Sequence, residues 1–198
     1  MGKIFILIGK SATGKDTIFK KLLEINELNL KTCVTYTTRP IRKSESNGVE
    51  YFFVDETVLN RLQKENKVIE QRSYNTVHGI WHYFTVNDGQ IKLDEANYLM
   101  LGTLESYMQI RKYYGKDRVI PLYLEADDDI RLLRAIAREQ KQEKPNYCEV
   151  CRRFLADEED FSEENLQKAG IKKRFKNNDL NLCLQELVEE LKNYTVNS

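Results

Sequence analysis

The chain has 198 residues, enough for one large domain or for a core with inserted subdomains. Its 31 lysines and arginines balance its 31 aspartates and glutamates, so it lacks the basic footprint of a nucleic-acid-binding protein. All apolar runs are much shorter than a membrane span, and Met1 leads almost directly into a predicted core strand, without room for a signal peptide. We therefore expect a cytoplasmic protein that binds neither nucleic acid nor membranes, as a monomer or a homodimer.

The first informative stretch joins a strand to a helix. Residues 4–8 are apolar and lead into a glycine, which predicts a buried parallel strand, and a helical spacing of apolar residues begins after Thr17. The loop between them lets successive backbone N–H groups point at a polyphosphate, whose outer phosphates Lys15 would reach. A chance match in an ordinary turn is the alternative. The predicted phosphate-binding residues are Gly9, Lys10, Ser11, Ala12, Thr13, Gly14, Lys15, Asp16 and Thr17.

One position in this loop departs from the usual pattern. The residue after the lysine is normally Ser or Thr, whose hydroxyl helps to hold Mg²⁺, but here it is Asp16, followed by Thr17. Asp16 is either a ligand on the metal side or a helix-capping carboxylate turned away from the phosphates. We therefore name Asp16 and Thr17 as candidate Mg²⁺ ligands, with the capping alternative open.

The next part of the chain is rich in strands. Strands are predicted at 33–38, 51–54, 68–74 and 80–86, with little helix between them. This arrangement favours a small antiparallel insertion, distinct from an alternating α/β core. We predict that the insertion covers 32–90 and that the core consists of 1–31 and 91–198.

The alternating pattern then resumes with a strand at 98–101, a helix at 103–114 and a strand at 119–124, in which Pro121 predicts an edge position or a bulge. Asp127 is predicted to cap the next helix. Two arginine-bearing helices follow, and a charged helical hairpin beside a phosphate-binding core is typical of a lid, here at about 134–160. The alternative for each arginine is a solvated charged face.

The four cysteines fit a reducing compartment with unpaired thiols. Cys148 and Cys151 have the spacing of a zinc half-site or a redox pair. Zinc needs two more ligands, and the only histidines, His78 and His82, lie far away in the sequence. We expect neither a zinc site nor a redox site.

The second informative stretch runs from residue 35 to residue 53, and it resembles the guanylate kinases. These enzymes carry the pattern Ser-x-Thr-Thr-Arg-x-x-Arg-x-x-Glu-x-x-Gly-x-x-Tyr-x-Phe in the subdomain that holds GMP. The matching residues here are Thr35 in place of the serine, Arg39, Arg42, Glu45, Gly48, Tyr51 and Phe53. The resemblance implies a P-loop three-layer αβα core with a parallel sheet, a β-rich insertion for the nucleoside monophosphate (NMP) and a helical lid. It also implies transfer of the γ-phosphoryl group from ATP to GMP with Mg²⁺.

The residues themselves support a monophosphate site. Arg39 and Arg42 supply forked donors beside the Tyr51 hydroxyl, which suits a dianionic phosphate, and the resemblance adds Thr35 to the GMP site. Glu70 matches the family position that reads guanine. A carboxylate accepts from guanine N1–H and N2–H together, whereas adenine would leave its charge unpaired. The alternative is a solvent-facing glutamate at a strand end.

Beyond Glu70 the resemblance loosens. The segment up to Tyr83 is longer than the family's turn, and we place Tyr83 on the monophosphate and Thr85 near the base oxygen. Where the family has a further carboxylate, this sequence offers Thr103. Guanine specificity is therefore less firmly predicted than monophosphate binding.

The resemblance also implies roles in the second half of the chain. Asn177 matches a segment that closes over the adenine of ATP, and the lid arginines join the loop lysine in neutralising phosphate charge without a general base. The residues expected to act in catalysis are Lys15, Arg39, Arg42, Arg134, Arg138 and Arg153. Two alternatives are a kinase of this fold for another nucleoside monophosphate or a phosphosugar, and a non-catalytic guanylate-kinase-like binding module.

Overall fold

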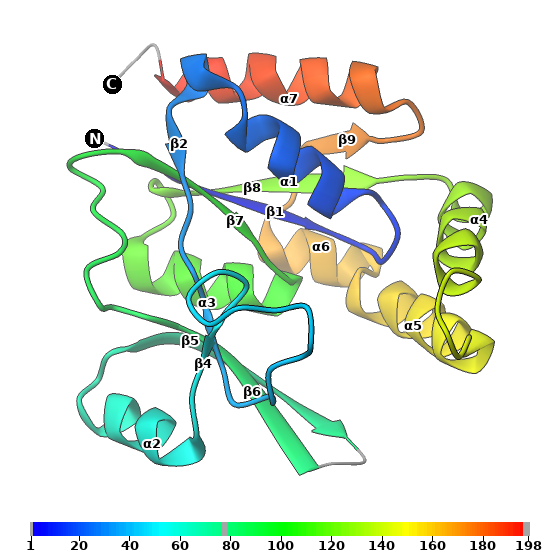
Figure 1. The fold of residues 1–198 in the computed structure, drawn as a ribbon. Helices are drawn as coiled ribbons and strands as arrows, with labels where there is room; N and C mark the ends of the chain where they lie inside the picture. Colours follow the sequence, from blue (N-terminus) through cyan, green and yellow to red (C-terminus); the bar gives the residue numbers. More distant parts are fainter. Residues whose placement is uncertain (1, 77–78, 196–198) are drawn as a thin grey trace.

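The computed structural model describes residues 2–76 and 79–195, so His78 lies outside the described residues. The core is a five-stranded parallel sheet with the order β2-β7-β1-β8-β9 (Figure 1). No helix in the described part of the chain is long and apolar enough to cross a membrane. The strands are β1 (Ile4–Gly9), β2 (Leu30–Lys31), β7 (Asn97–Leu101), β8 (Val119–Glu125) and β9 (Arg174–Lys176).

Helices cover both faces of this sheet because the apolar residues of β1 alternate between them. Ile4, Ile6 and Ile8 pack with α3 (Leu104–Tyr114) and α6 (Glu163–Ala169). Phe5 and Leu7 pack on the opposite face with α1 (Lys15–Leu23) and α7 (Leu180–Thr195) (Figure 1). The predicted three-layer αβα core is therefore confirmed.

A separate four-stranded sheet forms the predicted insertion, with the order β4-β3-β6-β5. β6 pairs antiparallel with both β3 and β5, whereas β3 and β4 form a short parallel pair. Leu59 and Leu62 of α2 (Glu56–Lys64) pack against Phe84 and Val86 and give this sheet its own small core. The strands are β3 (Tyr36–Thr37), β4 (Phe52–Phe53), β5 (Val68–Thr76) and β6 (Gly79–Val86).

Helix α3 connects the two sheets. It packs on the core sheet, and its Gln109 side chain also makes two hydrogen bonds to the backbone of Gln71 in β5. The Gln71 N–H donates to Gln109 Oε1 at 3.1 Å, and Gln109 Nε2 donates to the Gln71 carbonyl at 3.1 Å. This contact holds the second sheet against one layer of the core.

The two lid helices are α4 (Asp128–Glu139) and α5 (Tyr147–Asp160), and a short 3₁₀ helix, η1 (Asn26–Leu28), precedes β2. Asp127 occupies the N-cap position of α4, but its side chain does not make the predicted capping hydrogen bond. Its carboxylate instead accepts from Asn178 Nδ2 at 2.6 Å and pairs with Lys176 at 2.8 Å. The Asp127 carboxylate is therefore bound by the last residue of β9 and by the connection from β9 to α7, instead of by the N–H groups of its own helix.

β8 lies between β1 and β9, so it is not an edge strand as a whole, and its unbroken register with β1 shows no bulge at Pro121. β9 pairs only with Tyr123–Glu125, so Pro121 precedes that ladder. The missing proline N–H therefore removes no hydrogen bond to β9.

Candidate active site

The loop between β1 and α1 requires glycine at both of its ends. A Cβ on Gly9 would lie 2.3 Å from the Leu124 carbonyl oxygen of β8. Gly14 is the N-cap of α1 with φ near +90°, and a Cβ there would lie 2.4 Å from Asn177 Nδ2. Close approach by neighbouring elements therefore explains the two glycines of the motif.

Asn177 is hydrogen-bonded to the backbone of the predicted phosphate loop. Its Nδ2 donates to the Thr13 carbonyl at 2.7 Å, while the buried Thr13 hydroxyl donates to the Lys10 carbonyl at 2.9 Å. Asn177 is only 2% exposed. The residue expected at the adenine base edge therefore lies beneath the phosphate loop in this structure.

Lys15 lies inside the loop. Its Nζ donates to the carbonyl oxygens of Gly9 and Lys10, at 2.6 and 2.8 Å. Burial lowers the pKa of Lys15 to about 8, although the nearby carboxylates of Asp157 and Asp16 act to raise it. A triphosphate in the loop would supply the negative charge that this buried ammonium lacks.

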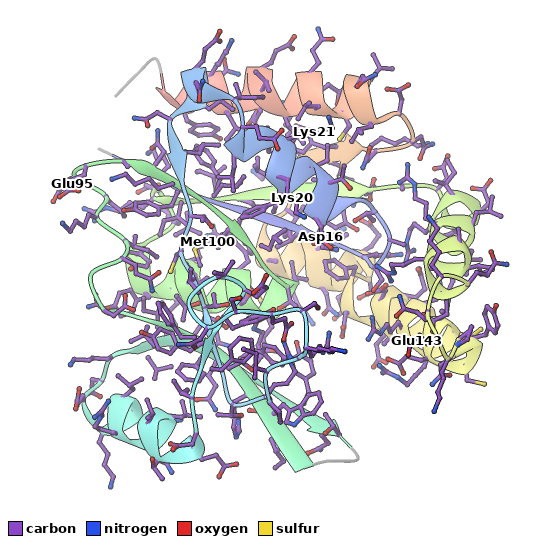
Figure 2. All side chains as sticks on the ribbon, viewed as in Figure 1. Asp16, Lys20, Lys21, Glu95, Met100 and Glu143 are labelled. Carbon is purple, nitrogen blue, oxygen red and sulfur yellow. The ribbon has the colours of Figure 1, made fainter. Side chains whose placement is uncertain are left out.

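Asp16 and Thr17 are exposed in the first turn of α1, and Figure 2 shows Asp16 beside the phosphate loop. The N-cap of this helix is Gly14, with no side-chain capping bond, so the structure does not support the capping role for Asp16. Neither side chain makes a hydrogen bond within the described residues. Their oxygens fit the donor set that Mg²⁺ prefers together with water and phosphate oxygens.

A cavity of about 810 Å³ opens between the loop and the lid. Ser11 of the loop lines it, and it extends along the α4–α5 hairpin as far as Glu143, which Figure 2 labels. Guanidinium groups are the side chains best suited to bind phosphate oxygens with paired donors. The arginines in its lining come from the insertion and from both lid helices: Arg42, Arg131, Arg138 and Arg153.

The other predicted lid arginine, Arg134, reaches a different part of the loop. Its Nη1 lies 4.0 Å from the position that a Cβ of Gly14 would take. Arg138 lies one turn further along α4 and lines the cavity, whereas Arg153 on α5 donates from Nε to Glu149 at 2.8 Å. Of these three arginines, Arg134 lies near Gly14, whereas Arg138 and Arg153 are exposed and line the cavity.

Two acidic residues of α5 contact the phosphate loop, which the sequence did not predict. Asp157 Oδ2 accepts from the Ser11 backbone N–H at 2.7 Å, and Glu158 pairs with Lys10 at 2.5 Å. A lid carboxylate therefore occupies a loop N–H group of the kind expected to bind phosphate. The acidic run at 157–160 was visible in the sequence, but its contact across the fold was not.

Arg131 holds these acidic residues in place and is only 1% exposed. Its Nη1 donates to Glu158 at 2.9 Å, its Nη2 to Asp157 at 3.2 Å and its Nε to the Ser11 carbonyl at 3.2 Å. Its guanidinium also lies 4.7 Å from the Phe154 ring centroid. The spacing of Arg131 from Arg134 was the only sequence signal for this residue.

One face of the second sheet brings Glu70 together with Thr85, the two residues that the resemblance assigns to the base of GMP. The two residues are opposite each other in β5 and β6, and the Thr85 hydroxyl donates to Glu70 Oε1 at 2.8 Å. Glu70 is buried, so the solvent-facing alternative is wrong. Arg72 adds a cation that the sequence interpretation missed, although its spacing of two residues from Glu70 places both side chains on one face.

Arg39, Tyr51 and Tyr83 form the neighbouring part of this face. The Arg39 guanidinium lies 5.5 Å from the Tyr51 ring centroid, and the Tyr51 and Tyr83 rings are 5.6 Å apart. Glu45 accepts from both Nη atoms of Arg39, at 2.9 and 2.8 Å. The hydrogen bond from Arg39 lowers the pKa of Glu45 to about 2.

Arg42 instead lines the cavity along the α4–α5 hairpin, so the two arginines of the motif lie in different regions.

Two threonines at predicted positions have mainly backbone roles. The Thr35 carbonyl accepts from the Phe52 N–H at 2.9 Å, beside the acceptor sheet. Thr103, at the position of the family's further carboxylate, caps α3 by accepting from the Ser106 N–H at 3.2 Å. Its hydroxyl is thus already used in the helix cap.

Several buried polar atoms in the described residues have no hydrogen-bond partner, and all belong to predicted site residues. Burial of such atoms is unfavourable, so they are strong candidates for ligand contacts. The atoms are Arg39 Nε, Arg134 Nη1 and Asn177 Oδ1.

The chain was compared with known proteins. A guanylate kinase family model matches residues 1–101. The guanylate kinase of Mycoplasma mobile is 33% identical over 202 residues, covering 97% of this chain and 91% of the relative. The guanylate kinase of Porphyromonas gingivalis is 29% identical over 189 residues, covering 94% of this chain and 95% of the relative. The crystal structure of guanylate kinase from Anaplasma phagocytophilum shares the fold, with a TM-score of 0.67 and 18% identity over 98% of this chain and 86% of that one. The chain belongs to the guanylate kinase family.

Proposed function

We propose that this chain is an ATP-dependent kinase that phosphorylates GMP, giving ADP and GDP. Its family membership supports this reaction. The observation that supports the site assignment is that one cavity is lined by Arg42 of the insertion, by arginines of α4 and α5 and, from the phosphate loop, by Ser11. A donor polyphosphate and an acceptor monophosphate both need cations at such a junction.

The donor side would consist of the phosphate-loop residues 9–17 with Lys15 at the outer phosphates. The acceptor side would consist of Arg39, Tyr51 and Tyr83 around the monophosphate and Glu70 with Thr85 at the base, with Thr35 beside them. The acceptor phosphate is already ionised, so alignment and charge neutralisation suffice without a general base. Arg42, Arg134, Arg138 and Arg153 would neutralise the charge that develops during transfer.

Mg²⁺ would supply a further positive charge that neutralises the phosphate oxygens during transfer. Asp16 and Thr17 would hold it, because both are exposed oxygen-bearing residues beside Lys15. Asn177 would contribute through the loop that it supports and through its unpartnered Oδ1.

The division of the chain follows from these roles. We assign 32–90 to GMP binding, 1–31 and 91–198 to the core, and about 134–160 to a lid that excludes water on closure. The zero formal net charge supports small nucleotides rather than nucleic acid as partners. The unpaired cysteines support a cytoplasmic location, and we retain a monomer or a homodimer as the assembly.

The test is direct detection of both products. Purified chain is incubated with ATP, GMP and Mg²⁺, and ADP and GDP are separated by chromatography. Equal amounts of ADP and GDP are expected. ATP binding without GDP formation would contradict the proposal and indicate a binding module instead.

A further inference from the structure

Glu70 and Arg72 form a buried ion pair in the acceptor sheet. Their side chains are 1% and 13% exposed. Arg72 Nε donates to Glu70 Oε2 at 3.1 Å, and Nη2 approaches Oε1 at 3.4 Å. Burial acts to lower the pKa of Arg72, but the charge and hydrogen bond of Glu70 together with the nearby Tyr74 and Tyr51 outweigh it, so this pKa lies above its usual value.

This pair is poorly explained by stability alone. Removing two charges from water is costly, and apolar residues of similar volume often stabilise a protein equally well. Glu70 and Arg72 lie opposite Thr85 and Tyr83, on the face that carries the acceptor site. Their position points to a role in that site.

The hydrogen bonds from Arg72 and Thr85 hold the Glu70 carboxylate in place but leave it able to accept hydrogen bonds from a ligand. A carboxylate has about four lone-pair positions. Arg72 takes one position on each Glu70 oxygen, and the Thr85 hydroxyl takes another on Oε1. A hydroxyl can rotate, so Thr85 is able to turn to the base oxygen and release its position to a guanine N–H. Arg72 meanwhile keeps the carboxylate plane in place.

We propose that Arg72 is a positioning residue for base recognition, which fixes the orientation of the Glu70 carboxylate so that guanine is preferred over adenine. The inference rests on the proposed function. Guanine offers N1–H and N2–H to a charged carboxylate, hypoxanthine offers only N1–H, and adenine offers an acceptor at N1. Without Arg72 the buried carboxylate would lose its countercharge and would either take up a proton or turn away.

The experiment compares the wild type with Arg72→Met, Arg72→Lys, Glu70→Gln and the double variant. Dissociation constants for GMP, IMP and AMP are measured by titration calorimetry, and kcat and KM for GMP by product formation. Arg72→Met is expected to weaken GMP binding by at least about tenfold while AMP binding changes less than about threefold. KM for GMP should rise more than kcat falls, and Arg72→Lys should recover part of the loss.

A double-mutant cycle tests whether Arg72 acts through Glu70. In the Glu70→Gln background, Arg72→Met should have less than about a threefold further effect on GMP binding. The matched control is Arg61→Met, at an exposed arginine of α2, which should leave all three dissociation constants unchanged.

Equal losses for GMP, IMP and AMP in Arg72→Met, or additive effects in the cycle, would overturn the proposal. If Arg72→Met does not fold, two other comparisons decide: Arg72→Lys with the wild type, and the double variant with Glu70→Gln. None of these proteins contains a buried Glu70 carboxylate without a countercharge. A wild type that binds GMP but does not phosphorylate it would refute the proposed function alone, since the binding constants still test Arg72.

Discussion

Lys15 is the residue at which burial and charge compete most directly. Burial lowers its pKa to about 8, from 10.5 for the unperturbed side chain. The unfolded chain therefore binds more protons than the native chain between these pH values, and Lys15 makes the free energy of unfolding rise with pH across that window. Catalysis should respond to pH in the opposite direction, because ATP binding requires the protonated, positively charged form of Lys15.

We therefore expect kcat/KM for ATP to fall as the pH rises above about 8. This parameter reports ionisations of the free enzyme, whereas kcat should fall only at higher pH because bound phosphates favour the ammonium form. Steady-state rates between about pH 7 and about pH 10 measure both parameters. A kcat/KM that stays flat over this range would refute the role of the buried ammonium.

Replacing Lys15 by Met should lower kcat/KM by about 100-fold or more, or about 3 kcal/mol of transition-state stabilisation, because phosphate charge loses its nearest cation. The matched control is Lys20→Met, an exposed lysine on the same helix that Figure 2 labels. It should retain wild-type rates. Near-normal turnover in Lys15→Met would show that the loop does not act as proposed.

Asp16 is the residue at which the phosphate loop departs from the usual sequence, and its variants test whether this departure changes Mg²⁺ binding. If Asp16 holds Mg²⁺, Asp16→Ala should raise the Mg²⁺ concentration for half-maximal rate by roughly tenfold, and Asp16→Ser should restore much of it. Rates measured over a Mg²⁺ titration provide the comparison. Identical titration curves for Asp16→Ala and the wild type would mean that other groups hold the metal.

At the scale of elements, α4 and α5 form more than a charged surface. Asp157 of α5 accepts from the Ser11 N–H, and Arg131 of α4 donates to Asp157 and to the Ser11 carbonyl. The lid is thus attached to the phosphate loop by groups that a triphosphate would have to displace.

Asp157→Asn should consequently strengthen ATP binding several-fold, because a neutral amide competes less well than a carboxylate for the loop N–H and repels phosphate less. Calorimetric titration with ATP gives the dissociation constant. Asp160→Asn, at an exposed carboxylate of the same helix, serves as the control. Weaker ATP binding in Asp157→Asn would instead mean that Asp157 helps to hold the nucleotide.

The sequence predicted most helices and strands correctly, because the residue patterns that specify them extend over only a few neighbouring residues. The apolar run of β1, the glycines of the loop and the alternation along β5 and β6 all depend on neighbours in the sequence. The lid attachment was not predictable in this way, because 146 residues separate Ser11 from Asp157. The Asp127 cap failed for a related reason: partners near Asn178 compete for its carboxylate.

At the scale of the whole molecule, the proposed function requires the phosphate loop and the second sheet to act on one pair of substrates. The α3 helix packs on the core and anchors β5 through Gln109, while the cavity extends from Ser11 to Arg42 and the lid. The resemblance of the stretch from Arg39 to Tyr51 to guanylate kinases is what predicted GMP binding at the second sheet. The spacing of Glu70 and Arg72 places both side chains on one face of β5, but their ion pair became visible only in the structure.

The most direct test of the account is acceptor selectivity with Mg²⁺ and ATP. kcat/KM is measured for GMP, dGMP, AMP, CMP, UMP and a phosphosugar under identical conditions. Because Glu70 is buried and charged beside Thr85, we predict that GMP is preferred over AMP by at least about 100-fold. Equal efficiencies for GMP and AMP, or a preference for a non-guanine acceptor, would contradict the central claim.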